Sequence, residues 1–149
     1  MSAPDPSPRS FDVAEVDATL ASSLDSLDDA LNYRNWIVDL CAPHLAGPIL
    51  EVGAGHGTFT ECYASFGDVT AVEPGPYAAN LLVERYADDA RITTVAGLVG
   101  DLPLEPSFGS AVMINVLEHI DDDQGVLRDI LDRLEPGGQL CIWVPSYEF

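Results

Sequence analysis

The sequence contains no lysine, so all six of its basic residues are arginines. They stand against 25 acidic residues, which gives a formal net charge of -19 at pH 7. A surface of this sign repels phosphate backbones and anionic lipid head groups, so nucleic acids and membranes are excluded as expected partners. The simplest physical reading of the charge is solubility, including solubility in a high-salt cytoplasm.

Long apolar runs and cysteine motifs are also missing. No run approaches the roughly 20 residues that span a bilayer, and residues 1–10 lack the apolar core of a signal peptide. The three cysteines, Cys41, Cys62 and Cys141, are far apart and form no C-x-x-C motif. Their odd number and spacing argue against a disulfide framework and against a zinc site, so we expect no metal and a cytoplasmic location.

Composition and length instead indicate one globular domain. The chain has 149 residues, of which 47% are hydrophobic, enough for a single core. Its start is rich in proline and serine, so we expect a flexible segment over residues 1–22 and a folded domain over residues 23–149.

Hydrophobic periodicity divides this domain into helices and short strands. A pattern with spacings near three and four predicts a helix over residues 23–44. Short apolar runs predict five strands, over residues 49–52, 69–72, 91–95, 111–116 and 139–144. Further helices are expected between them, over residues 58–66, 76–87 and 121–134. Such alternation predicts a doubly wound α/β fold with a ligand crevice at the carboxyl ends of its parallel strands.

The strongest local motif is a glycine-rich stretch that follows the first predicted strand. It reads Glu51-Val52-Gly53-Ala54-Gly55-His56-Gly57, and its glycines allow a tight turn and a close approach of a ligand to the backbone. Glu73 ends the second strand, 20 residues after Gly53, where an acid can accept the hydroxyl protons of a ribose. A purely structural turn and a generic nucleotide loop remain alternatives.

Two cofactor classes compete for this motif. A nicotinamide site prefers G-x-G-x-x-G, but here the last glycine, Gly57, comes one position early. S-adenosyl-L-methionine fits better, because it has a ribose and no pyrophosphate. Its ammonium group could be attracted by Glu51, which lies two residues before the first glycine.

Four blocks in order resemble the class I S-adenosyl-L-methionine-dependent methyltransferases, which are Rossmann-like. They are ILEVGAGHGTFT (49–60), TAVEP (70–74), AGLVGDLPLEPSFGSAVMINVLEHIDDD (96–123) and LEPGGQLCIWVP (134–145). The resemblance covers roughly residues 30–149. It implies a doubly wound, mainly parallel sheet of order 3-2-1-4-5 with helices on both faces, truncated so that strands six and seven of the family sheet are absent.

The resemblance also implies a set of cofactor-binding residues, with Gly53 and Gly55 at the amino acid end of the cofactor and Glu73 on its ribose. The full set is Glu51, Gly53, Ala54, Gly55, Glu73, Pro74, Gly97, Leu98, Asn115 and Val116. Leu98 departs from the family pattern, which often has an acid there for the adenine amino group. Adenine would then rest on apolar and backbone contacts, or on Asp101 if the loop bends.

The implied function is transfer of a methyl group from S-adenosyl-L-methionine to a small-molecule acceptor that the sequence does not identify. His119 is a candidate general base, although a structural role in its turn is the competing interpretation. The alternatives are a cofactor-binding module without catalysis and, less favoured, an NAD-dependent oxidoreductase. The apolar fifth strand would lie at a sheet edge, so we expect a homo-oligomer through it, or instability unless it is covered.

Replacement of Gly55 by arginine is expected to abolish S-adenosyl-L-methionine binding, because the added side chain fills the glycine loop. Titration calorimetry on the variant measures this directly. An unchanged affinity would show that the loop does not hold the ligand.

Overall fold

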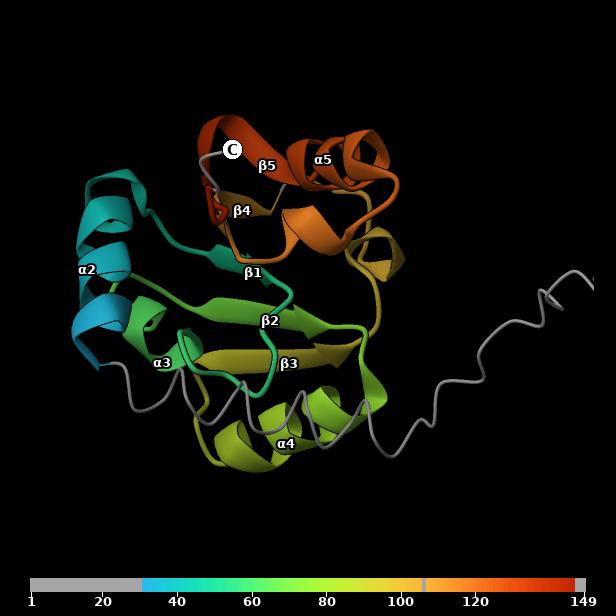
Figure 1. Cartoon of the computed structure of the whole chain (residues 1–149). Coiled ribbons are helices and arrows are strands. Elements are labelled where there is room, and N and C mark those ends of the chain that lie inside the picture. Colours follow the sequence, from blue (N-terminus) through green and yellow to red (C-terminus); the bar gives the residue numbers. More distant parts are fainter. Residues whose placement is uncertain (1–30, 106, 147–149) are drawn as a thin grey trace, which may run out of the picture.

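Five strands and four helices make up the part of the chain that the computed structural model describes, residues 31–105 and 107–146 (Figure 1). The strands are β1 (Ile49–Val52), β2 (Val69–Glu73), β3 (Ile92–Ala96), β4 (Phe108–Ile114) and β5 (Leu134–Trp143). The helices are α2 (Leu31–Cys41), α3 (Thr60–Tyr63), α4 (Pro76–Tyr86) and α5 (Asp123–Leu131). Short 3-10 turns occur at η1 (Ala42–His44), η2 (Val99–Asp101) and η3 (Leu117–His119).

The sheet is parallel throughout and has the order β3-β2-β1-β4-β5. In its centre, Ile49 of β1 lies opposite Val69 of β2 on one side and Ser110 of β4 on the other. The chain therefore winds outward from β1 in both directions, which confirms the expected doubly wound fold. In such a sheet the ligand crevice lies where the order reverses, at the carboxyl ends of β1 and β4.

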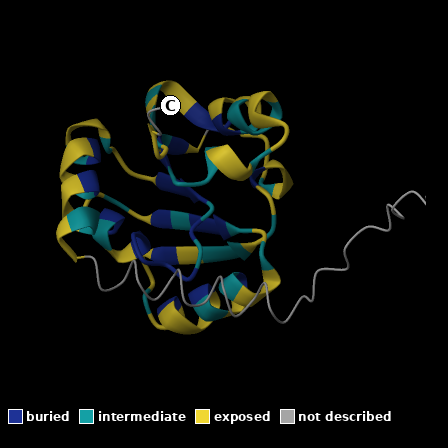
Figure 2. Ribbon diagram, viewed as in Figure 1, coloured by how far each residue is buried: buried dark blue, intermediate teal, exposed yellow. Residues whose placement is uncertain are grey.

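Side chains alternate between the two faces of the sheet and build one apolar cluster on each. The central strands are the most buried part of the ribbon, and the helices that cover them are exposed on their outer sides (Figure 2). The first cluster includes Ile37, Tyr63 and Leu82, so α2, α3 and α4 cover one face. The second includes Val99 and Ile130, so η2 and α5 cover the other. Burial on both faces explains why the central strands show no polar alternation.

Four predicted elements have clearly different bounds in the structure. The strand expected over residues 111–116 is β4, which starts at Phe108 and ends at Ile114. The expected helix over residues 58–66 is reduced to α3, because the chain turns after Phe66 where Gly67 packs directly on Gly47. The helix expected over residues 121–134 ends at Leu131.

The predicted fifth strand, over residues 139–144, starts earlier in the structure, at Leu134. Phe108 pairs with Leu134 but Ser110 pairs with Gln139, so β5 contains extra residues around Gly137, whose φ is 87°. The Pro-Gly-Gly sequence thus forms an irregularity within the strand instead of separating helix from strand. Residues 1–22 and the first part of the helix expected over residues 23–44 lie outside the described residues.

A buried arginine joins α5 to the turn that follows β3. Arg133 is 2% exposed, and its guanidinium donates to the carbonyl oxygens of Asp129 (2.7 Å), Gly100 (3.0 Å) and Leu102 (2.7 Å). Its charge also lies 3.8 Å from the Asp129 carboxylate. These bonds satisfy carbonyl groups that would otherwise be unpaired beside the apolar cluster.

In the described parts of the chain, every helix is too short or too polar to cross a membrane.

Replacement of Arg133 by methionine is expected to lower the free energy of unfolding by about 3 kcal/mol, because it leaves three carbonyl groups without their donor. Urea denaturation measures the change. Arg128→Met, which removes an exposed arginine from α5, serves as the control and should cost far less. Equal effects of the two substitutions would show that the buried bonds add nothing.

Candidate functional site

The loop after β1 folds back over the end of β2. Gly53 and Ala54 both donate their N–H groups to the Val72 carbonyl oxygen, at 2.9 and 3.0 Å. Gly53, Gly55 and Gly57 all have positive φ, at 72°, 58° and 94°. Residues with side chains rarely adopt this conformation, so the glycines of the motif are required by the path of the loop.

The end of this loop is closed by an aromatic residue of α4. The Tyr86 hydroxyl donates to the Gly57 carbonyl oxygen at 2.7 Å, and a side chain at Gly57 would collide with the Tyr86 ring. Burial raises the pKa of Tyr86 to about 12, so the hydroxyl keeps its proton at neutral pH. On the other side, Arg34 of α2 donates to the Thr58 carbonyl oxygen at 3.4 Å and lies 3.4 Å from the Glu61 carboxylate.

Glu73 connects the loop to the start of α4. Its Oε2 accepts from the Gly55 N–H at 2.8 Å, and its Oε1 accepts from the Gly75 N–H at 2.7 Å. Each carboxylate oxygen has a second lone pair, so the group can still accept protons from ligand hydroxyls. The half-buried carboxylate is thus held at the position that the sequence predicted for a ribose-binding acid.

Glu51 lies beneath the loop and is 5% exposed. The Thr60 hydroxyl donates to its Oε2 at 2.6 Å. Burial is the main cause that raises the pKa of Glu51 from 4.5 to about 8, and the charge of Glu73 adds to the effect. Glu51 therefore carries a proton near neutral pH, and a cation placed beside it would favour the ionised form.

The end of β4 faces the same loop. A side chain at Gly53 would collide with Val116, so these two chain segments are in close contact. Asn115 has a φ of 54°, and its N–H donates to the Trp143 carbonyl oxygen at 2.8 Å. Its buried Oδ1 has no hydrogen-bond partner in the structure, which leaves an acceptor available for a ligand.

The segment after β3, where adenine is expected to bind, bends so that Asp101 lies next to Leu98. The Leu98 N–H donates to the Asp101 Oδ2 at 2.9 Å, and the Gly97 N–H donates to the Glu73 carbonyl oxygen at 3.1 Å. Both N–H groups are therefore already engaged within the protein. A ligand here would contact the exposed Leu98 side chain. To bond the Leu98 N–H group, it would have to displace the Asp101 carboxylate.

The other predicted site residues differ in exposure. Ala54 is buried in the loop, whereas Pro74 is exposed at the end of β2. His119 lies on η3 with its side chain 77% exposed, and its Nε2 is 4.0 Å from the Glu118 carboxylate. Among residues 31–105 and 107–146, no group of three or more His, Cys, Asp or Glu side chains could hold a metal ion.

Two residues that support the loop from outside were not predicted from the sequence. Arg34 and Tyr86 lie on helices far from the glycine motif in the chain, and no spacing links them to it.

A Rossmann-like domain is defined by these features together: a doubly wound parallel sheet, a glycine loop at its switch point and an acid at the end of β2. The loop, the two acids and the unpaired Asn115 Oδ1 fit a ligand that carries hydroxyl and ammonium groups. The chain belongs to the family described as "Methyltransferase domain", whose model matches residues 50–142. This confirms the resemblance seen in the sequence.

Comparison with known proteins supports this assignment. The chain is 30% identical over 114 residues to a ubiquinone biosynthesis O-methyltransferase of Xanthomonas campestris pv. campestris. The aligned region covers 70% of this chain and 47% of the relative. The chain is therefore similar to less than half the length of that curated relative.

Two solved structures have the same fold. One is a Haemonchus contortus phosphoethanolamine N-methyltransferase bound to S-adenosylhomocysteine, with a TM-score of 0.66 and 28% identity over 74% of this chain and 27% of that chain. The other is the glycopeptide N-methyltransferase MtfA bound to S-adenosyl-L-methionine, with a TM-score of 0.62 and 26% identity over 73% of this chain and 48% of that chain.

Glu51 is expected to make folding stability pH-dependent. Because the pKa of Glu51 is higher in the folded chain (about 8) than its ordinary value (4.5), its contribution is complete below pH 4.5 and is lost as the pH rises to 8. Glutamine cannot ionise, so Glu51→Gln does not lose stability in this way as the pH rises. The stability of the variant relative to the wild type should thus rise between these limits, by up to roughly 1.4 kcal/mol per pH unit.

Urea denaturation of both proteins across this pH range measures the difference in their free energies of unfolding. The effect of the general negative charge is common to both proteins and cancels in this difference. Glu84→Gln, at an exposed position on α4, is the matched control and should follow the wild-type curve. A difference between Glu51→Gln and wild type that does not change with pH would mean that Glu51 is ionised throughout.

Proposed function

We propose that this chain is the cofactor-binding domain of an S-adenosyl-L-methionine-dependent methyltransferase that acts on a small molecule. The observation that carries the proposal is the position of Glu73. Its carboxylate holds the glycine loop at the switch point of the sheet and keeps acceptor capacity for a ribose. The match to the methyltransferase domain family supports the same conclusion.

In this proposal each residue of the site binds a different part of the cofactor. Glu73 accepts protons from the ribose hydroxyls, and the backbone at Gly53 and Gly55 borders the amino acid end. Glu51 stabilises the ammonium group, either directly or through water, once its own proton is lost. The unpaired Oδ1 of Asn115 provides a further acceptor at the mouth of the crevice.

The bound cofactor supplies a methyl group activated on a sulfonium. The protein's part is to fix the direction of attack and to keep water away from the site. A base is needed only for an acceptor that must lose a proton, and we assign that role to His119, whose exposed ring lies on the turn just after Asn115. The alternative, a module that binds the cofactor without transferring the methyl group, requires no general base.

A small-molecule acceptor is supported by charge and by the relatives. The net charge of -19 disfavours nucleic acid. The names of the similar proteins refer to ubiquinone biosynthesis, to phosphoethanolamine and to a glycopeptide, none of which is a nucleic acid.

We also propose a cytoplasmic protein that self-associates through β5. All three cysteines are free, which suits a reducing compartment. In the described sheet β5 pairs on one side only, with β4, and it exposes Ile142. An open edge with apolar side chains favours pairing with a second chain.

Glu73→Ala is expected to weaken binding of S-adenosylhomocysteine by about 1–3 kcal/mol, because it removes a charged acceptor from the ribose and releases the Gly55 N–H. Titration calorimetry on the wild type and the variant measures the loss. Glu84→Ala removes an exposed acid from α4 and should bind like the wild type.

NAD is titrated in parallel as the competing ligand. Binding of NAD instead of S-adenosylhomocysteine to the wild type would overturn the proposal. A Glu73→Ala change below a few tenths of a kcal/mol would place this carboxylate outside the site.

A further inference from the structure

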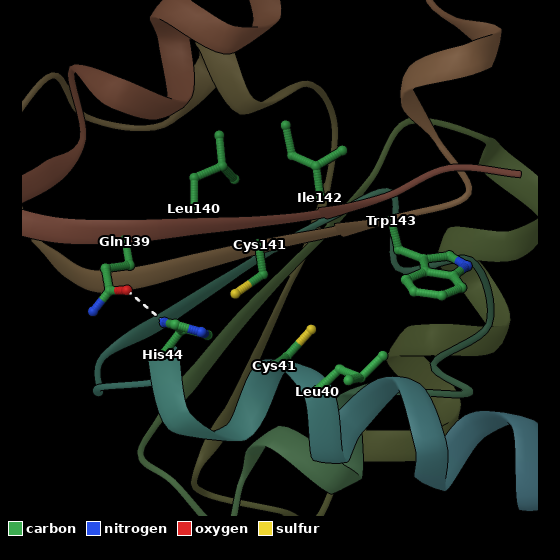
Figure 3. Close-up of a pocket in the computed structure, with 8 residues that line it drawn as sticks. All are labelled: Leu40, Cys41, His44, Gln139, Leu140, Cys141, Ile142 and Trp143. Carbon is green, nitrogen blue, oxygen red and sulfur yellow. Dashed lines mark hydrogen bonds between the residues drawn. The ribbon is translucent and has the colours of Figure 1, made fainter. Parts of the chain in front are cut away.

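A groove lies between the end of α2 and the edge strand β5 (Figure 3). Its volume is about 410 Å³. The lining residues are Leu40, Cys41, His44, Gln139, Leu140, Cys141, Ile142 and Trp143. This groove is not part of the candidate cofactor site.

Two thiols meet in this groove. Cys141 lies on the face of β5 that is turned toward α2, and its sulfur points toward α2 while the sulfur of Cys41 points toward β5 (Figure 3). The two thiols interact strongly enough for each to change the pKa of the other. Cys41 is buried, whereas Cys141 is only partly buried and lines the groove.

The surroundings of the pair favour ionisation of Cys141. The interaction with the Cys41 thiol and the nearby His44 lower the pKa of Cys141 to about 7, while the pKa of Cys41 is raised. His44 is held in place by the 2.8 Å hydrogen bond between its Nδ1 and the Gln139 Oε1. Among the described lining residues, only His44 and the two cysteines can titrate.

The third cysteine provides an internal contrast. Cys62 lies on α3, outside the groove, and burial raises its pKa. A thiol that stays protonated is a poor nucleophile, so the three cysteines should differ in reactivity.

We propose that Cys41 and Cys141 form an oxidisable dithiol whose co-reactants are low-molecular-weight disulfides. The Cys141 thiolate attacks one sulfur of the small disulfide, forms a mixed disulfide and releases the other half as a thiolate. In the mixed disulfide Cys141 is no longer a thiolate, so the main cause that raises the pKa of Cys41 is gone. Cys41 then loses its proton to solvent, and its sulfur attacks that of Cys141. This second step forms the Cys41–Cys141 bond and releases the remaining half, so one disulfide is reduced for each one formed.

The new bond would tie together two elements that border the cofactor site. Arg34 of α2 bonds the Thr58 carbonyl oxygen at the end of the glycine loop, and the Trp143 carbonyl oxygen of β5 accepts the Asn115 N–H. A link between α2 and β5 that closes a loop of about 100 residues restricts the unfolded chain strongly. The oxidised protein should therefore unfold at a higher temperature than the reduced protein.

The experiment uses the reduced wild-type chain, which is incubated with oxidised glutathione near neutral pH and then treated with iodoacetamide. Because the chain has no lysine, trypsin cuts only after arginine and leaves Cys141 in residues 134–149 and Cys41 in residues 35–85. A glutamate-specific protease cuts after Glu51 and Glu61 and separates Cys41 from Cys62. The expected result is a mass loss of two hydrogen atoms, a Cys41–Cys141 cross-link and an alkylated Cys62.

Two variants test the separate steps of the thiol–disulfide exchange. Cys62→Ser should form the same cross-link, and Cys41→Ser should retain glutathione on Cys141 as a mixed disulfide. Cross-links that contain Cys62, links between chains only, or full alkylation of both Cys41 and Cys141 would each overturn the proposal. The wild-type peptide map decides the question even if a variant fails to fold, and its outcome does not depend on the proposed methyltransferase function.

Discussion

The carboxylate of Glu73 is the interaction on which the candidate site depends. It accepts one N–H group from the glycine loop and one from the start of α4, and charge-assisted hydrogen bonds of this kind are among the stronger ones in proteins. Its own carbonyl oxygen accepts the Gly97 N–H from the segment after β3. Three connections that leave different strands are thus fixed at the end of β2, so the shape of the site is present without a ligand.

Around this anchor the site retains two buried polar groups that are not fully hydrogen-bonded. Glu51 is buried with one short hydrogen bond and a pKa near 8, and the Asn115 Oδ1 is buried without a partner. By contrast, the equally buried Arg133 bonds three carbonyl oxygens and has a structural role. The unpaired Asn115 Oδ1 lies at the switch point of the sheet, where a departure from full hydrogen bonding suits a functional role.

Periodicity and spacing predicted most of the fold. Five parallel strands and the position of the crevice follow from alternating strands and helices, because right-handed crossovers leave few other arrangements. The order of the strands was implied by the family resemblance, and the structure confirms it. The errors lie where local propensity competes with packing. Helix α3 is short because Gly67 packs on Gly47, and β5 begins at Leu134 because β4 pairs with residues before the Pro-Gly-Gly sequence.

The sequence by itself determined the glycine loop and the acid at the end of β2, because positive φ angles require glycine and parallel strands bring their carboxyl ends to one edge. Only the tertiary structure decided which distant side chains meet. Arg34 and Tyr86 reach the loop from two helices, and Cys41 meets Cys141 although the sequence separates them widely. Such contacts depend on how each helix packs on the sheet, and no periodicity in the chain encodes them.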